Sequence, residues 1–382
     1  MTKIIADENI PYVKEIFCHL GEVKCVPGRS MDKEMVREAD VLLVRSVTQV
    51  GRELLDGTSV GFVGTATIGT DHIDREYLAK NSIGFADAAG SNANSVAEYV
   101  ITAILAVAQP SRMELKGKSM GIIGVGNIGS KVEKYAQALG LHVLPNDPPL
   151  QRQTGDVRFV PLGKALEADI VSLHVPLSRS GPDATYHLID EEKLSKLKGD
   201  TVLINTSRGA VVETQALKIA LKARTLGPVV LDVWENEPDI DVELLDEGSI
   251  ATAHIAGYSL DGKVNGVAML YHALCRFLQV SDTLKVNDLL PAPPVPEIEL
   301  DTEKFSEQEL LGKAFTGIYD IRRDDRELRA ITDQPAEKRG QFFDQLRKNY
   351  PIRREARNTR IKLNPPQPQL AEELIRMGFQ VE

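Results

Sequence analysis

Three side chains of the kinds that move a proton and hold an anion follow apolar runs of this chain. Arg208 comes after the run 202–205, Glu237 after 229–232 and His254 after 250–253. A histidine can take a hydroxyl proton near neutral pH, because its ordinary pKa is about 6.5. A carboxylate beside it orients the ring, and a guanidinium binds a carboxylate through two parallel hydrogen bonds. Together the three types predict hydride exchange at a hydroxyl carbon next to a carboxylate.

Each of the three side chains also has an ordinary interpretation. A lone histidine at a strand end is more often structural, an arginine often forms a surface ion pair, and Glu237 before a proline is a common loop carboxylate. Their order along the chain, after a glycine-rich turn, favours a shared site. His142, His174 and His272 lack such neighbours and are interpreted as structural. No histidine pair has the spacing of a zinc-binding helix, so we expect no metal.

The glycine-rich turn lies between an apolar strand and a helical pattern. Its sequence is Gly124-Val-Gly126-Asn-Ile-Gly129. The first glycine permits a tight turn, the second lets a pyrophosphate approach the backbone, and the third lets helix and strand pack closely. Asp147 ends the next apolar run, where a carboxylate accepts hydrogen bonds from ribose hydroxyls and repels a 2′-phosphate. The sequence therefore predicts a dinucleotide site with NAD preferred over NADP.

Short apolar runs alternate with helical patterns through most of the chain. Runs at 3–6, 41–44 and 60–63 precede the glycine-rich turn, and runs at 170–174, 202–205, 229–232 and 250–253 follow it. This βαβ alternation predicts the α/β class, with parallel sheets and ligands beyond the carboxyl ends of the strands. We expect two Rossmann-like, doubly wound lobes. One is a substrate lobe at 1–93, completed by about 258–286, and the other is an NAD-binding domain at 94–257.

The remaining segments predict long helices and a further domain. The sequence from Ser95 to Glu98 is typical of a capping box, and helical patterns run from there to Val107 and from Gly262 to about Val280. The prolines of 291–296 predict a stiff linker. Residues 287–382 are interpreted as a C-terminal α+β domain. The mixed charges of 321–327 are typical of a solvated helix surface.

Composition narrows the class of protein. The chain has 382 residues, 42% of them hydrophobic, and a net charge of −10. That length allows two or three domains, and the charge argues against a nucleic-acid surface. Three cysteines without a Cys-x-x-Cys pair fit a reducing compartment. Without a signal peptide or a membrane-spanning run, we expect a cytoplasmic protein that binds neither membrane nor nucleic acid.

From Lys3 to about Val280 the chain resembles the D-isomer-specific 2-hydroxyacid dehydrogenases. The motifs are the glycine turn and the sequences NTSRG at 205–209, DVWENEP at 232–238 and HIAG at 254–257. The resemblance implies that Arg208, Glu237 and His254 are catalytic, with His254 as the acid/base. It also implies NAD contacts from Gly124, Gly126, Asn127, Ile128, Gly129, Asp147, Val175, Asn205, Thr206, Ser207, Arg208, Asp232 and Gly257.

Other stretches resemble a narrower branch of that family, whose substrate is a small phosphorylated 2-hydroxy acid. They are LVRSVT at 43–48, GTATIGTDH at 64–72, HIAGYS at 254–259 and the tail with YPIRRE at 350–355. The resemblance implies that Ser46, Thr67 and Tyr258 contact substrate and that the C-terminal domain forms a homodimer.

The substrate phosphate needs a local cation, because the net charge of the chain repels it. We assign this role to Arg45, next to Ser46, with help from Arg353 or Arg354 of the tail. An ion pair within the lobe is an equal alternative for Arg45, and ion pairs within the tail are the better alternative for the other two.

Two other functions fit part of the pattern. Some transcriptional corepressors share this fold and these three residues, so a nucleotide-sensing protein is one alternative. The complete set of three residues and the lack of long disordered arms favour catalysis. A different phosphorylated acid, such as 3-phosphoglycerate, is the second alternative. It is disfavoured because the tail does not resemble a small regulatory amino-acid-binding module.

Overall fold

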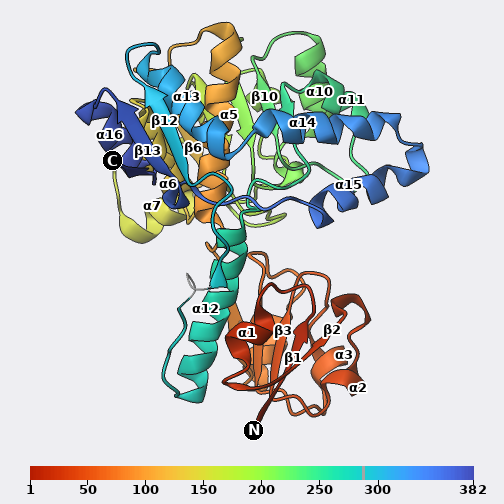
Figure 1. Ribbon diagram of the computed structural model, residues 1–382. Helices are drawn as coiled ribbons and strands as arrows, with labels where there is room; N and C mark the ends of the chain where they lie inside the picture. The colour runs from red at the N-terminus through yellow and green to blue at the C-terminus, as the bar shows by residue number, and fades with distance from the viewer. Residues whose placement is uncertain (286–288) are drawn as a thin grey trace. The chain divides into compact units, whose positions relative to one another are not determined.

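The computed structural model describes residues 1–285 and 289–382, which form two compact units. Unit 1 comprises Met1–Asn92 and Ser259–Ala292, and unit 2 comprises Ala93–Tyr258 and Pro293–Glu382. The chain therefore visits each unit twice (Figure 1). The last ninety or so residues belong to the same compact unit as the glycine-rich turn.

Unit 1 contains a parallel five-stranded sheet in the order β2-β1-β3-β4-β5. Its strands are β1 (Thr2–Asp7), β2 (Gly21–Val26), β3 (Val41–Val44), β4 (Phe62–Thr65) and β5 (Gly84–Asp87). Its helices are α1 (Val13–Phe17), α2 (Lys33–Val36), α3 (Arg52–Leu55), α4 (Arg75–Lys80) and α12 (Leu260–Leu278). Apolar side chains of α12, such as Val267 and Leu274, pack on Ile4 and Val41 of the sheet. The order of connection reverses between β1 and β3, so their carboxyl ends form a natural ligand crevice.

Unit 2 contains a parallel six-stranded sheet in the order β11-β10-β9-β8-β6-β7, which confirms the α/β prediction. Its strands are β6 (Ser119–Ile123), β7 (His142–Asn146), β8 (Ile170–Leu173), β9 (Val202–Asn205), β10 (Val229–Leu231) and β11 (Ile250–Ala251). Its first helices are α5 (Ala93–Ser111), α6 (Gly129–Ala138), α7 (Pro148–Thr154), α8 (Leu162–Leu166), α9 (Glu191–Leu194), α10 (Thr214–Lys222) and α11 (Val242–Glu247). The order reverses between β6 and β8, where the glycine-rich turn begins.

The C-terminal part of unit 2 adds a parallel three-stranded sheet in the order β12-β13-β14. Its elements are β12 (Glu297–Asp301), α13 (Glu307–Ile318), α14 (Ile321–Arg329), α15 (Arg339–Lys348), β13 (Arg360–Asn364), α16 (Pro368–Arg376) and β14 (Gln380–Val381). No helix in the described residues combines the length and apolar character needed to cross a bilayer.

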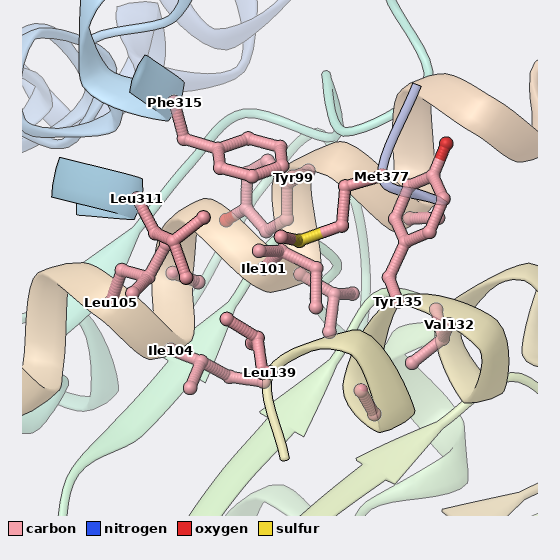
Figure 2. Packing of buried hydrophobic residues seen from close by; sticks show 14 of the residues in the cluster. Tyr99, Ile101, Ile104, Leu105, Val132, Tyr135, Leu139, Leu311, Phe315 and Met377 are labelled. Atoms are coloured by element: carbon pink, nitrogen blue, oxygen red, sulfur yellow. The ribbon is translucent and has the colours of Figure 1, made fainter. Parts of the chain in front are cut away.

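Helix α5 joins the two parts of unit 2 through one hydrophobic core. Figure 2 shows its side chains, among them Tyr99, Ile101 and Leu105, between residues of α6 and residues of the C-terminal part. The partners are Val132, Tyr135, Leu139, Leu311, Phe315 and Met377. Because these residues are buried together, the C-terminal part is packed as a layer of the nucleotide unit.

Two local predictions in this region are wrong. Helix α5 begins at Ala93, so Ser95 and Glu98 lie within the helix and do not cap it. The Ser95 hydroxyl instead donates to Glu355 Oε1 (3.0 Å), and Glu98 Oε1 accepts from the Ala356 amide (2.9 Å). In α14 the charges are not all solvated, because Asp325 is 8% exposed and accepts a hydrogen bond from the Ala251 amide (2.8 Å). In both cases a partner far along the chain decides the role of the residue.

Candidate active site

The glycine-rich turn is tight at two glycines and open at the third. Gly124 has φ +89°, and a Cβ there would lie 2.9 Å from the His174 carbonyl carbon. A Cβ on Gly129 would lie 2.0 Å from the Gly124 oxygen, whereas a Cβ on Gly126 would meet nothing within 4 Å. Asn127 and Ile128 complete the turn at the N-terminus of α6. The open backbone at Gly126, followed by the N-terminus of α6, suits a pyrophosphate.

Asp147 stands at the end of β7 and is held against this turn. Its Oδ2 accepts a hydrogen bond from the Val125 amide (2.8 Å), and its Oδ1 caps α7 by accepting from the Leu150 amide (2.9 Å). The carboxylate is therefore fixed beside the turn, where the sequence placed a ribose contact. Each oxygen keeps a second lone pair, so it can also accept from a hydroxyl.

A hydrogen bond joins the loop after β8 to the loop after β9. His174 lies between the Ser172 hydroxyl (2.9 Å from Nε2) and the Thr206 hydroxyl (3.3 Å from Nδ1), and Val175 follows it. Burial lowers the pKa of His174 to about 3, so the ring is neutral, as a structural histidine should be. Asn205 Oδ1 accepts from both the amide and the hydroxyl of Ser207, and its Nδ2 donates to the Arg208 carbonyl (3.0 Å).

Gly209 brings the Arg208 loop against the loop that carries Glu237. A Cβ on Gly209 would lie 1.9 Å from the Trp234 carbonyl carbon, so no other residue fits there without moving backbone. Arg208 Nη1 donates to the Ser207 carbonyl (2.8 Å), which holds one nitrogen of the guanidinium group in place. The close approach of these two backbones is therefore what places Arg208 next to the carboxylate and the histidine.

Glu237 and His254 form the central contact of the site. His254 Nδ1 lies 2.7 Å from Glu237 Oε2, and Glu237 Oε1 accepts from the Trp234 amide (2.8 Å). Burial alone would raise the pKa of Glu237, but these hydrogen bonds and the histidine charge hold that pKa below its ordinary value. An ionised carboxylate only accepts, so Nδ1 carries the hydrogen and Nε2 is the nitrogen that can take a proton.

Arg208, Glu237 and His254 line one pocket of about 300 Å³ in unit 2. The pocket is also lined by Leu177, Arg179 and Tyr186 from the segment after β8. Arg179 lies over the Tyr186 ring at 4.3 Å, Tyr186 stacks on His187 at 4.0 Å, and His187 Nε2 lies 2.9 Å from Glu235. Sequence reasoning missed this stack. Its only signal in the sequence was the long connection to which residues 178–183 belong, after the apolar run 170–174.

The backbone of His254 is unusual and is held by Asp232. His254 has φ +54°, a left-handed conformation that is uncommon for histidine, and its amide donates to the Asp232 carbonyl (2.7 Å). The Asp232 carboxylate is buried and accepts from Thr252 (2.6 Å), Ile255 (2.8 Å) and Ala256 (3.0 Å). These bonds shape the loop that runs on to Gly257 and Tyr258. The proposed contact of Asp232 with NAD would be additional to this structural role.

The other predicted substrate residues lie in unit 1, at the crevice between β1 and β3 or close to β4. Arg45 Nε donates to Asp7 Oδ2 (3.0 Å), and Asp7 is fully buried at the end of β1. Ser46 follows and is exposed. Thr67 Oγ1 lies 2.8 Å from the Thr65 hydroxyl, which in turn lies 2.9 Å from His72 Nε2. The ion pair of Arg45 is the alternative that the sequence left open, and it also fixes the guanidinium at this edge.

The tail residue Arg353 has a different place from the one first considered. It is 6% exposed and donates to the Ala256 carbonyl, so its side chain is buried against the loop that follows His254. A role for it in supporting a substrate phosphate is therefore not favoured.

Comparison with known families defines the class. Residues 105–256 match the NAD binding domain of the D-isomer specific 2-hydroxyacid dehydrogenases. Residues 289–378 match a domain of unknown function (DUF3410). A solved D-lactate dehydrogenase from Aquifex aeolicus, in complex with NAD and lactic acid, is 26% identical with a TM-score of 0.59, over 73% of this chain and 96% of that one. The fold, the glycine turn and these matches define an NAD-dependent 2-hydroxyacid dehydrogenase, which confirms the predicted cofactor.

Curated relatives narrow the class further. Erythronate-4-phosphate dehydrogenase from Marinobacter nauticus is 43% identical over 99% of both chains. The enzyme of that name from Tolumonas auensis is 44% identical, again over 99% of both chains. Identity at this level over the whole length includes the C-terminal part. The chain belongs to the erythronate-4-phosphate dehydrogenase family.

Proposed function

We propose that this protein oxidises 4-phospho-D-erythronate at C2 with NAD to (R)-3-hydroxy-2-oxo-4-phosphooxybutanoate. In this proposal the reaction is a cytoplasmic step in the biosynthesis of pyridoxal phosphate, vitamin B6. The structural observation that carries it is the 2.7 Å contact between His254 and Glu237, in one pocket with Arg208. The names of the relatives support the choice of substrate.

The three pocket residues have separate tasks. His254 removes the C2 hydroxyl proton through Nε2, because Nδ1 is engaged by Glu237 (2.7 Å). Glu237 orients the ring and stabilises the imidazolium that results. Arg208 binds the substrate carboxylate. Bound NAD supplies the acceptor for the hydride that leaves C2, so the C–H and O–H bonds are replaced by a carbonyl and His254 later releases its proton to solvent.

Other side chains and the C-terminal part complete the proposal. Ser46, Thr67 and Tyr258 contact the substrate. Arg45, whose guanidinium is held by Asp7 (3.0 Å), supports the phosphate. The protein forms a homodimer through residues 287–382. Light scattering on the purified chain should then give about twice the monomer mass of 42.0 kDa. Monomers at micromolar concentration would contradict the dimer.

The deciding assay follows NADH formation with three acids. We expect kcat/KM for 4-phospho-D-erythronate to exceed that for unphosphorylated erythronate by about 100-fold or more, because unpaired cationic groups disfavour the smaller acid. It should also exceed the value for 3-phosphoglycerate. A preference for 3-phosphoglycerate would overturn the choice of substrate. If none of the acids were oxidised, a nucleotide-sensing protein would be the better interpretation.

Two variants test the assigned residues in the same assay. His254→Ala should lower kcat by about 10²- to 10⁴-fold while NADH binding persists, since the glycine turn is untouched. Equal turnover would refute the role of His254. Arg45→Ala should raise KM for the phosphorylated acid only, and an unchanged kcat/KM would remove Arg45 from the proposal.

A further inference from the structure

A buried arginine from the C-terminal part of unit 2 lies against the loop that carries His254. Arg353 follows α15 in sequence and is 6% exposed. Its Nη2 donates to the carbonyl of Ala256, two residues after His254, and its guanidinium lies 4.4 Å over the Tyr319 ring. Its Nη1 is buried and finds no hydrogen-bond partner among the described residues.

Burying an arginine with so few hydrogen-bond partners destabilises the folded protein, which points to a functional reason for its position. Removing a guanidinium from water is unfavourable, and only good geometry or added hydrogen bonds offset that penalty. Among the residues that the structure describes, Arg353 has one backbone acceptor and one aromatic face, which is an incomplete set for a buried cation with five donors. The same packing could be supplied by an apolar side chain at lower cost. What an apolar side chain cannot supply is the bond to the Ala256 carbonyl.

Tyr258, two residues after Ala256, also contacts the C-terminal part. Arg347 of α15 lies over the Tyr258 ring at 5.6 Å, and Tyr350 meets that ring edge-on at 5.8 Å. The Tyr350 hydroxyl donates to Asp324 of α14 (2.7 Å). The side chains of Arg347, Tyr350 and Arg353, all from the C-terminal part, therefore contact the loop from Ala256 to Tyr258.

The loop needs such support because His254 is held in an unfavourable conformation. A non-glycine residue with φ +54° is strained and persists only where its surroundings determine it. Asp232 accepts hydrogen bonds from the amides of Ile255 and Ala256 (2.8 and 3.0 Å). Arg353 donates to the Ala256 carbonyl. Hydrogen bonds therefore hold both the amide and the carbonyl of Ala256, two residues after the histidine.

We propose that Arg353 is a positioning residue for the His254–Glu237 pair, so that the C-terminal part of unit 2 completes the active-site loop. The inference rests on the proposed function for the identity of the substrate only. It assigns a task to the region that matches a domain of unknown function, and this task lies within one chain and does not depend on dimerisation.

The test compares three variants of the full-length enzyme. Arg353→Met keeps the packing but removes the donor, and Arg353→Lys keeps the charge without the planar fork. Arg360→Met is the control, because Arg360 lies in the same region but is 52% exposed in a surface ion pair with Glu382. We expect Arg353→Met to lower kcat by about 10- to 100-fold, as small displacements of a catalytic group do. The Kd for NADH should change by less than about threefold. Arg353→Lys should be intermediate, and the control should behave as wild type.

A second readout needs neither substrate nor turnover. The Nδ1 hydrogen between His254 and Glu237 should give a far-downfield proton NMR signal, assigned by its loss in His254→Ala. We expect this signal in wild type and in Arg360→Met, and its broadening or loss in both Arg353 variants. If wild type oxidises none of the acids, the proposed function fails while this signal still tests the positioning role.

The outcomes that overturn the inference are specific. A wild-type kcat and an unchanged signal in Arg353→Met would show that the loop does not need the bond. A parallel loss of kcat, NADH binding and thermal stability, with Arg353→Lys no better than Arg353→Met, would show a role in stability alone. Should Arg353→Met fail to fold, a wild-type kcat and signal in Arg353→Lys would also refute the proposal.

Discussion

At the scale of single residues, the site depends on which nitrogen of His254 remains available. Glu237 occupies Nδ1 and is itself fixed by the Trp234 amide, so the geometry leaves Nε2 for the substrate. This arrangement needs an ionised carboxylate, and its lowered pKa ensures that it is ionised throughout the neutral range. Glu237 thus acts on the reaction through the histidine, with no need to touch the substrate.

The variant Glu237→Gln tests this dependence. An amide is neutral and weakens the hydrogen bond to the imidazolium, and a hydrogen bond to a charged group contributes about 1.5–3 kcal/mol. We therefore expect kcat to fall by about 10- to 100-fold with little change in NADH affinity. Glu247→Gln, at the exposed end of α11, is the matched control in the steady-state assay. Wild-type turnover in Glu237→Gln would contradict the assigned role.

His174 should make the stability of unit 2 depend on pH. Burial lowers its pKa to about 3 in the folded protein, whereas an unfolded histidine titrates near about 6.5. The unfolded chain then binds a proton that the folded chain does not, so this stability is complete above about pH 6.5 and is lost as the pH falls. We expect a loss of about 1 kcal/mol between pH 7 and 5.5, reduced because part of the ring reaches the surface.

Urea unfolding at the two pH values measures this effect. The variant His174→Gln keeps a polar group near Ser172 and Thr206 but has no proton to gain, so its pH dependence should be smaller than that of wild type. His142→Gln controls for the loss of a histidine on the exposed start of β7. The same pH dependence in His174→Gln and wild type would show that another group is responsible.

At the scale of elements, we expect different glycines of the glycine-rich turn to serve folding and cofactor binding. Gly124 and Gly129 are required by contacts within the protein, but a Cβ on Gly126 would meet nothing within 4 Å. Gly126→Ala should therefore fold with an unchanged melting temperature. It should nevertheless raise the Kd for NADH by about tenfold or more, because the methyl group stands where a pyrophosphate would approach the backbone.

Gly199→Ala is the control for Gly126→Ala, since its Cβ also meets nothing within 4 Å and it lies in the connection before β9. Fluorescence titration with NADH and a thermal melt are sufficient for both variants. If Gly126→Ala bound NADH as tightly as wild type, the cofactor would have to lie elsewhere.

The elements that sequence reasoning predicted well are those set by local patterns. The strands β3 and β9 have the predicted bounds, and the glycine turn joins β6 to α6 as its spacing indicated. The failures have one physical cause. Ser95 bonds to Glu355, Asp325 to Ala251 and Arg353 to Ala256, and these partners lie between 74 and 260 residues away in sequence. No local pattern encodes such a partner, so the capping box and the solvated charge run were reasonable but wrong.

At the scale of the whole molecule, the shared core of unit 2 predicts that the C-terminal part and the NAD site unfold together. Phe315 is fully buried on α13, packs edge-on against Phe379 at 5.1 Å and lies in the same core as Tyr99 of α5 (Figure 2). Phe315→Ala should cost about 3–5 kcal/mol, as large-to-small changes in cores do. This loss of stability should lower the denaturant midpoint measured by NADH binding as much as the midpoint measured by helix content.

Phe305→Ala is the control for Phe315→Ala, because Phe305 lies in the same region but is 36% exposed. It should leave both midpoints nearly unchanged. A Phe315→Ala protein that loses helix content at low denaturant while still binding NADH would show two independently folding parts.

The shared core also has a consequence for how the protein is made. The face of α5 that holds Tyr99 and Leu105 is covered by residues of α13 and by Met377, close to the end of the chain. A ribosome releases α5 early and those residues last, so the nascent chain carries an uncovered apolar helix through most of its translation. Such surface attracts chaperones and invites aggregation. We therefore expect a stalled chain that lacks its last hundred residues to be retained by chaperones, and NADH binding to begin only when synthesis is nearly complete.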